Sequence, residues 1–78
     1  MNYDNLHQKT IYDFTNDAKV IEGLTAGMTK REYLETLKEN PVNNGLDLAE
    51  LAEMTGNKEL AAAVDKQYKD DFANYFNE

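Results

Sequence analysis

Two apolar helical patterns joined by a short turn constrain the fold of this chain more than any other feature. The first pattern, residues 46 to 55, places its apolar residues with the spacing of a helix face: Leu46, Leu48, Leu51 and Ala52. The second, residues 58 to 76, places a broad stripe within roughly 80° of Val64 at 100° per residue: Leu60, Ala61, Tyr68, Phe72 and Tyr75. Gly56 ends the first helix and Asn57 caps the second. The two stripes predict a helix pair that supplies most of the core.

A third helix is predicted over residues 30 to 39. Thr29 and Glu32 have the spacing of a capping box, in which each side chain accepts a hydrogen bond from the backbone of the other residue. Pro41 disfavours a helical residue before it, so the helix ends near Asn40. The inward side chains of this helix are Tyr33, Leu34 and Leu37. The next five residues, PVNNG, have the composition of a turn-rich loop.

The N-terminal segment carries a further helical stripe, formed by Tyr3, Leu6, His7, Thr10, Ile11 and Phe14. We expect one helix near residues 4 to 22, bent or frayed near Thr15. In the alternative interpretation, residues 15 to 17 start a second helix, because Thr, Asn and Asp are good caps and poor interior residues. Gly23 and Gly27 then bracket a linker.

Together these patterns predict an all-α fold, a compact bundle of about four helices in a single acidic domain spanning residues 1 to 78, with a helix-turn-helix-like pair at 46 to 76. No segment alternates apolar and polar residues as a strand does. The predicted core consists of Leu34, Leu37, Leu48, Leu51, Leu60, Val64 and Tyr68.

Composition restricts the environment and the partners. The chain lacks cysteine, which excludes disulfides and thiolate chemistry and is compatible with a reducing compartment. It also lacks an apolar run long enough to span a membrane and the charged and apolar regions of a secretory signal, so we expect a cytoplasmic protein without membrane contact. Fifteen carboxylates against eight Lys and Arg give a net charge of −7. This charge repels phosphate backbones and makes direct nucleic-acid binding unfavourable.

Residues for catalysis or metal binding are sparse. The single histidine, His7, lies on the inward side of the N-terminal stripe, where a partly buried structural role is expected. No phosphate-binding loop, zinc motif or nucleophile elbow is present. The acidic run near the C-terminus interleaves Lys66 and Lys69 with Asp65, Asp70 and Asp71, which is typical of a solvated helix face. We therefore expect neither an enzyme nor a bound metal or cofactor.

One stretch, LAEMTGNKELAAAV, resembles the helix-turn-helix of small repressors. In that family a small residue precedes the turn glycine by four positions, as Ala52 precedes Gly56 here. The resemblance covers fourteen of the 78 residues and implies a small transcriptional regulator. The sequence departs from the pattern at Asn57, where an apolar residue is usual, and the second helix offers alanines in place of side chains that reach bases.

The carboxylates form two rows on the outer sides of the predicted helices. Asp47, Glu50 and Glu53 recur every third residue on one helix, and Glu32, Glu35 and Glu39 do so on another. Such rows either solvate the surface or bind Lys and Arg on a basic partner, in the extreme case imitating nucleic-acid phosphates. Compact acidic phage products that block host nucleases, polymerases or defence complexes share this character. We expect an inhibitor or adaptor of a basic, nucleic-acid-binding protein.

A third hypothesis concerns the C-terminal aromatic residues. The last predicted helix carries a stripe of large aromatic rings: Tyr68, Phe72, Tyr75 and Phe76. A chain of 78 residues has too few other side chains to bury this whole stripe, so we expect it to contact a partner or a second copy of the chain. The sequence thus leaves open a monomer or a homodimer, and three functions: an acidic interaction module, a helix-turn-helix regulator and a self-associating structural protein.

Overall fold

The computed structural model describes residues 2 to 77 and contains no strand within them. In chain order the elements are two short 3-10 helices and five α-helices: η1 (Leu6–Gln8), η2 (Ile11–Asp13), α1 (Ala18–Thr25), α2 (Lys30–Glu39), α3 (Val42–Thr55), α4 (Lys58–Gln67) and α5 (Lys69–Phe76). The all-α prediction is therefore confirmed, with five α-helices where about four were expected.

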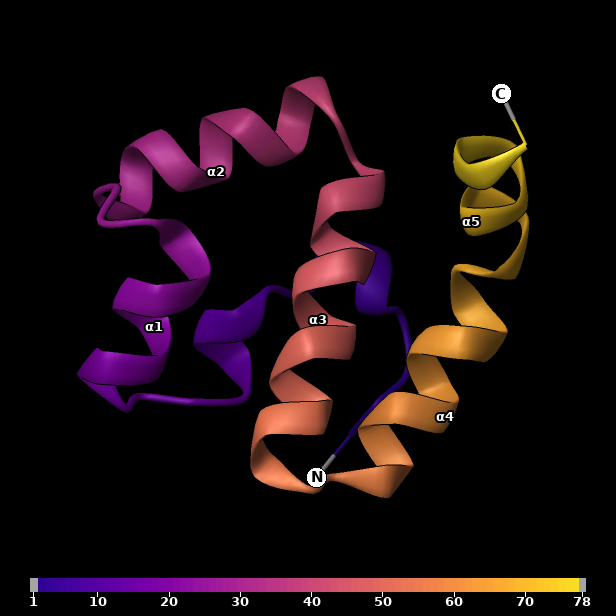
Figure 1. Cartoon of the computed structure of the whole chain (residues 1–78), viewed down its shortest axis with the longest axis horizontal. Helices are drawn as coiled ribbons and strands as arrows, with labels where there is room; N and C mark the ends of the chain where they lie inside the picture. The colour runs from indigo at the N-terminus through magenta and orange to yellow at the C-terminus, as the bar shows by residue number, and fades with distance from the viewer. Residues whose placement is uncertain (1, 78) are drawn as a thin grey trace.

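Helix α3 is the centre of the molecule. Every other element packs against it, and α4 does so most extensively, returning alongside α3 after a tight turn (Figure 1). Helices α1 and α2 lie on the opposite side of α3 from α4, and the N-terminal segment runs from beside α4 across α3 to the side of α1 (Figure 1). The turn to α4 uses Gly56 in the left-handed conformation (φ 68°), followed by Asn57, whose Oδ1 accepts a hydrogen bond from Leu60 N at 3.0 Å.

The core agrees closely with the sequence-based prediction. Six of the seven predicted core residues are buried: Leu37, Leu48, Leu51, Leu60, Val64 and Tyr68. Leu34 is only partly buried, because α2 turns Tyr33 and Leu37, one helical turn apart, toward α3 and leaves Leu34 at the edge of that contact. Further core positions come from Leu6, Ile11, Tyr33 and Ala52.

The predicted N-terminal helix over residues 4 to 22 is wrong. Asn5 has φ 56°, which no helix interior accommodates. Thr10 and Asp13 then form a capping box of their own, in which Asp13 Oδ2 accepts from Thr10 N at 2.9 Å, and this box starts η2. Asp17 caps α1 by accepting from Lys19 N at 3.0 Å, so the alternative of a second helix is correct.

The predicted linker after Gly23 begins too early. Helix α1 continues through Gly23 to Thr25 and ends at Ala26, which is left-handed at φ 53°. Gly27 follows at φ 80°, a conformation that glycine adopts without steric cost. Two left-handed residues in succession therefore turn the chain toward α2.

The predicted loop of residues 41 to 45 is also wrong, because α3 begins at Val42. Pro41 stands immediately before the helix, where its missing N–H breaks no helical hydrogen bond. Asn44 and Gly45 lie inside the first turns of α3 and are buried. The proline therefore ends one helix and begins the next.

The long helix predicted over residues 58 to 76 is divided at Tyr68, whose backbone (φ −108°, ψ 11°) departs from helical values. Hydrogen bonds continue on both sides, from Tyr68 N to Val64 O and from Phe72 N to Tyr68 O. The Tyr68 hydroxyl lies 2.9 Å from Asn44 Nδ2 in the core, so tertiary packing fixes this residue. Helix α5 beyond it contains no buried residue.

Candidate interaction surface

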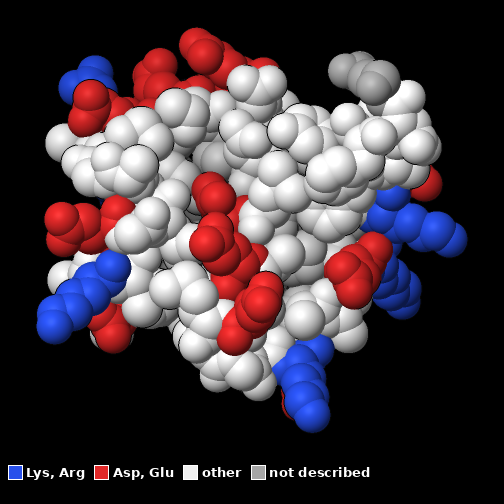
Figure 2. All heavy atoms as spheres, in the orientation of Figure 1, with Lys and Arg blue, Asp and Glu red and all other residues white. Residues whose placement is uncertain are grey.

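The acidic row on α3 faces outward over part of its length. Glu50 and Glu53 are exposed, whereas Asp47 is partly buried. In Figure 2 acidic side chains run down the middle of the displayed face, over the position of α3, without a basic side chain among them. The two glutamates therefore present negative charge on the central helix of the fold.

Asp47 has a different role from the other two members of that row. Its Oδ2 accepts a hydrogen bond of 2.6 Å from the hydroxyl of Tyr33, which is buried on α2. Partial burial raises the pKa of the Asp47 carboxyl, the Tyr33 hydrogen bond opposes this, and neighbouring Glu50 adds to the rise. Desolvation and the Asp47 charge also raise the pKa of Tyr33, so the phenol remains a donor. Asp47 thus links α2 to α3, and its expected place on the outer row is only partly right.

The three carboxylates of the α2 row also have different roles. Glu32 Oε1 accepts from Thr29 N at 3.0 Å, and Thr29 Oγ1 accepts from Glu32 N at 3.2 Å, which is the predicted capping box. The backbone hydrogen bond from Thr29 lowers the pKa of the Glu32 carboxyl. Glu35 and Glu39 are exposed and have no such contact among the described residues. The carboxylates with no structural task on the two helices are therefore Glu35, Glu39, Glu50 and Glu53.

Ion pairing leaves this charge almost uncompensated. Between residues 2 and 77, the single salt bridge within 4.0 Å joins His7 Nε2 to Asp71 Oδ2 at 3.0 Å. No Lys or Arg lies that close to a carboxylate in the same part of the chain. Helix α3 has three acidic residues and no Lys or Arg, whereas α2 has as many basic residues as acidic ones, so the net negative charge of the two helices comes from α3.

The four predicted aromatic contact residues do not form one exposed stripe. Tyr68 is 1% exposed and belongs to the core, so its assignment to a contact surface is wrong. Phe72 stacks on Tyr68 with ring centroids 5.7 Å apart and is partly buried. Tyr75 and Phe76 are 49% and 67% exposed, and their rings contact each other edge to face. Among residues 2 to 77, the large aromatic side chains that are exposed are therefore Tyr75 and Phe76. They lie at the end of α5, at one side of the molecule (Figure 1).

His7 lies on the surface, contrary to the expected inward position. Its ring stacks on Tyr68 with a centroid separation of 4.1 Å, and about half of its side chain is exposed. Leu6 and Ile11 take the inward positions of the N-terminal segment. The irregular backbone explains the difference, because a 3-10 turn rotates each residue further than an α-helix does.

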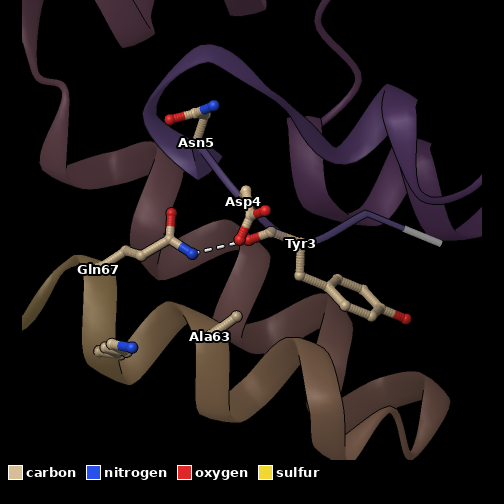
Figure 3. Close-up of a pocket in the computed structure, with 6 residues that line it drawn as sticks. Tyr3, Asp4, Asn5, Ala63 and Gln67 are labelled. Atoms are coloured by element: carbon tan, nitrogen blue, oxygen red, sulfur yellow. Dashed lines mark hydrogen bonds between the residues drawn. The ribbon is translucent and has the colours of Figure 1, made fainter.

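A polar pocket of about 640 Å³ lies where the N-terminal segment crosses α4, and the sequence carries no motif that predicts it. Gln67 spans this junction: its Nε2 donates to Tyr3 O at 2.7 Å (Figure 3). Its Oε1 accepts from Leu6 N at 2.8 Å. Asp4 and Lys66 add one charge of each sign to the lining. The junction therefore fastens the N-terminal segment to α4 by pairing backbone groups that would otherwise lack partners.

No group of three or more His, Cys, Asp or Glu side chains between residues 2 and 77 is arranged to hold a metal ion, and Asp65, Asp70 and Asp71 do not form one. No helix in the same range has the length and apolar character needed to cross a membrane.

Comparison with protein-family models, with curated proteins and with solved structures found no match to this chain.

Proposed function

We propose that this protein is a non-catalytic interaction module that binds a basic surface of another protein through the carboxylates of α2 and α3. The observation that carries the proposal is the exposed pair Glu50 and Glu53 on α3, a helix without Lys or Arg. Glu35 and Glu39 on α2 are also exposed and form no salt bridge, although that helix has as many basic residues as acidic ones. A surface that binds Lys and Arg must keep its carboxylates accessible and unpaired in the free state. The partner class that fits is a cytoplasmic nucleic-acid-binding protein, which the acidic face would inhibit by taking the place of phosphates.

The rigidity of α3 supports the same proposal. The helix is the most enclosed element of the fold, with Leu48, Leu51 and Ala52 in the core, so the backbone that carries Glu50 and Glu53 is held in place. A helix that is already ordered loses no backbone entropy when it meets a partner, and its charges steer association over a distance of about 8 Å at physiological ionic strength. Binding is expected to be fast and to weaken as salt is added.

A pair of double variants tests this proposal. Glu50→Lys with Glu53→Lys reverses the α3 row, and Glu22→Lys with Asp70→Lys reverses two exposed carboxylates on α1 and α5 as a control. Each pair adds four units of charge, so the net charge changes from −7 to −3 in both. Partners would be captured from a host lysate with the unaltered protein and identified by mass spectrometry. Affinity for one purified partner would then be measured for all three proteins.

We expect the double reversal on α3 to abolish binding and the control double reversal to leave it nearly unchanged. Affinity of the unaltered protein should also fall as the salt concentration rises. Binding that survives the α3 reversal and is insensitive to salt would contradict the charged surface. Loss of binding in both pairs would show that net charge matters and the position of the charges does not.

The transcriptional regulator is a separate hypothesis, based on the turn between α3 and α4. Exposed side chains of α4 include both signs of charge, with Lys58 and Lys66 beside Glu59 and Asp65, and a small residue at Ala62. Few of these side chains could pair with DNA phosphates or donate hydrogen bonds to base edges. Retardation of random duplex DNA in a gel would support the regulator, whereas relief of another protein's retardation would support the inhibitor.

A further inference from the structure

A groove of about 380 Å³ lies between α3 and α4, the two helices that form most of the core. Small side chains line its centre: Ala49 and Ala52 from α3 and Ala61 from α4. Ala52 is buried, whereas Ala49 and Ala61 are partly exposed. Gly56, in the turn between the helices, lines one end, and a Cβ added there would meet no atom within 4 Å. The two helices therefore leave apolar surface between them that a partner can contact.

Exposed carboxylates stand on both edges of this groove. Glu53 lines it from α3 and Asp65 from α4, and neither forms a salt bridge with another residue in the range 2 to 77. Figure 2 shows acidic side chains over both helices, with uncharged surface between them. Glu50, exposed one turn before Glu53, extends the acidic edge on α3, while Lys58 adds a positive charge where α4 begins. The edges thus carry more negative than positive charge.

The shape and the charge of the groove together fit a helix that carries Lys or Arg. Two helices packed side by side leave a trough along which a third helix can lie, and small side chains in that trough let its backbone come close. Carboxylates on both edges can pair with basic residues that flank the apolar face of such a helix. A second copy of this chain fits less well, because its net charge of −7 is repelled by the acidic edges.

We propose that the groove between α3 and α4 receives an amphipathic helix of the basic partner. The apolar residues of that helix would pack on the alanines, and its Lys or Arg residues would pair with Glu50, Glu53 and Asp65. This inference rests on the proposed function, since the partner is the same basic protein, and it adds an apolar contact to the charged one. It also brings Asp65 on α4 into a binding surface that the rows on α2 and α3 do not include.

Three synthetic peptides of 14 residues, the length of α3, separate the apolar contact from the charged one. The first peptide places Leu on one face of a helix and Lys on both sides of that face. The second replaces each Lys by Glu, and the third keeps the Lys and replaces each Leu by Gln. Each would be titrated into isotope-labelled protein, with the backbone amides of Ala49, Gly56 and Ala61 followed by NMR. We expect the first to shift these signals, the second not to bind, and the third to bind about tenfold more weakly than the first, because it buries no leucine.

Two substitutions on α4 provide the matched test. Ala61→Gln places a longer side chain in the groove, whereas Ala63→Gln alters another partly buried alanine, which lines the polar pocket beside Tyr3. We expect Ala61→Gln to weaken the first peptide by about tenfold and Ala63→Gln to leave its affinity unchanged. Circular dichroism would verify that both variants fold, and the comparison of the three peptides needs neither variant.

The outcomes separate this inference from the proposed function. Equal affinity of the first and third peptides, equal losses in the two variants, or no shift with any peptide would overturn the groove. The charged surface would then still be decided by the reversal of Glu50 and Glu53 against the captured partner. Equal affinity of the first and second peptides would count against the charged surface as well. Self-association that Ala61→Gln abolishes would show that a second copy occupies the groove, which also overturns the inference.

Discussion

The ring of Tyr68 lies directly against the backbone of Gly45, so a Cβ at position 45 would stand 2.6 Å from the ring carbon Cδ1. Tyr68 is buried and closes α4, while Gly45 lies in the first turns of α3. A helical glycine is unfavourable by itself, and this one permits the close approach of a large ring. The contact joins the two helices that form most of the core.

Replacing Gly45 tests this contact against a matched site. Gly45→Ala gains about 1 kcal/mol of helix propensity but forces the ring to move, so we expect a net destabilisation of about 1 to 3 kcal/mol. Gly23→Ala in α1 meets no atom within 4 Å and should stabilise the protein by about 0.5 to 1 kcal/mol. Urea unfolding of both variants would measure the difference. Stabilisation by both substitutions would contradict the close packing of Tyr68 on α3.

The capping box of α2 gives a second prediction. Thr29→Ala removes the acceptor for Glu32 N, and we expect the free energy of unfolding to fall by about 1 kcal/mol. Thr36→Ala serves as the control, because the Thr36 hydroxyl donates to Tyr33 O, a carbonyl in the same helix, and alanine has the higher helix propensity. The control should change stability by less than about 0.5 kcal/mol. Equal losses in guanidinium unfolding would argue against the cap.

The same capping chemistry shows what the sequence does and does not reveal. The box at Thr29 predicts the bounds of α2 correctly because its glutamate stands just before an apolar stripe. The box of Thr10 and Asp13 is hidden inside a stripe that also fits one long helix. Spacings of three residues suit both α and 3-10 turns, so periodicity alone does not separate them.

Tertiary contacts explain the other differences. Pro41 is both a helix stop and a helix start, and the preceding Asn40 does not indicate which role dominates. The break at Tyr68 has no local signal, since neither glycine nor proline is near it, and it follows from the burial of that side chain against Gly45 and Asn44. The acidic residues were identifiable from the sequence, whereas the hydrogen bond that engages Asp47 depends on a residue fourteen positions away.

The aromatic end of α5 gives a third prediction. Phe72→Ala should destabilise the protein by about 1 to 2 kcal/mol, because Phe72 is partly buried and stacks on Tyr68. Phe76→Ala should change stability by less than about 0.5 kcal/mol, because that ring is 67% exposed. Thermal unfolding followed by circular dichroism would compare the two. The self-associating alternative would instead be supported by a sedimentation coefficient that rises with protein concentration in the unaltered protein and does not do so in Phe76→Ala.

The fourth prediction concerns the hydrogen bond between Tyr33 and Asp47. Burial raises the Asp47 pKa above the ordinary value of 3.8, so the folded state holds the carboxyl proton more tightly than the unfolded state does. The burial penalty on the charged form is therefore complete above the raised pKa and disappears as the pH falls toward 3.8. Asp47→Asn keeps an acceptor for the Tyr33 hydroxyl and removes the charge.

We therefore expect Asp47→Asn to stabilise the protein at neutral pH, by less than about 1 kcal/mol because solvent screens a partly exposed carboxylate. The difference from the unaltered protein should shrink as the pH is lowered toward 3.8. Tyr33→Phe should destabilise by about 1 kcal/mol at neutral pH, since it leaves Asp47 without its donor. Urea unfolding across this pH range measures all three proteins. If the difference in stability between Asp47→Asn and the unaltered protein stays constant with pH, the raised pKa of Asp47 is contradicted. If Asp47→Asn loses much stability at neutral pH, the charged carboxylate is the favourable partner of Tyr33.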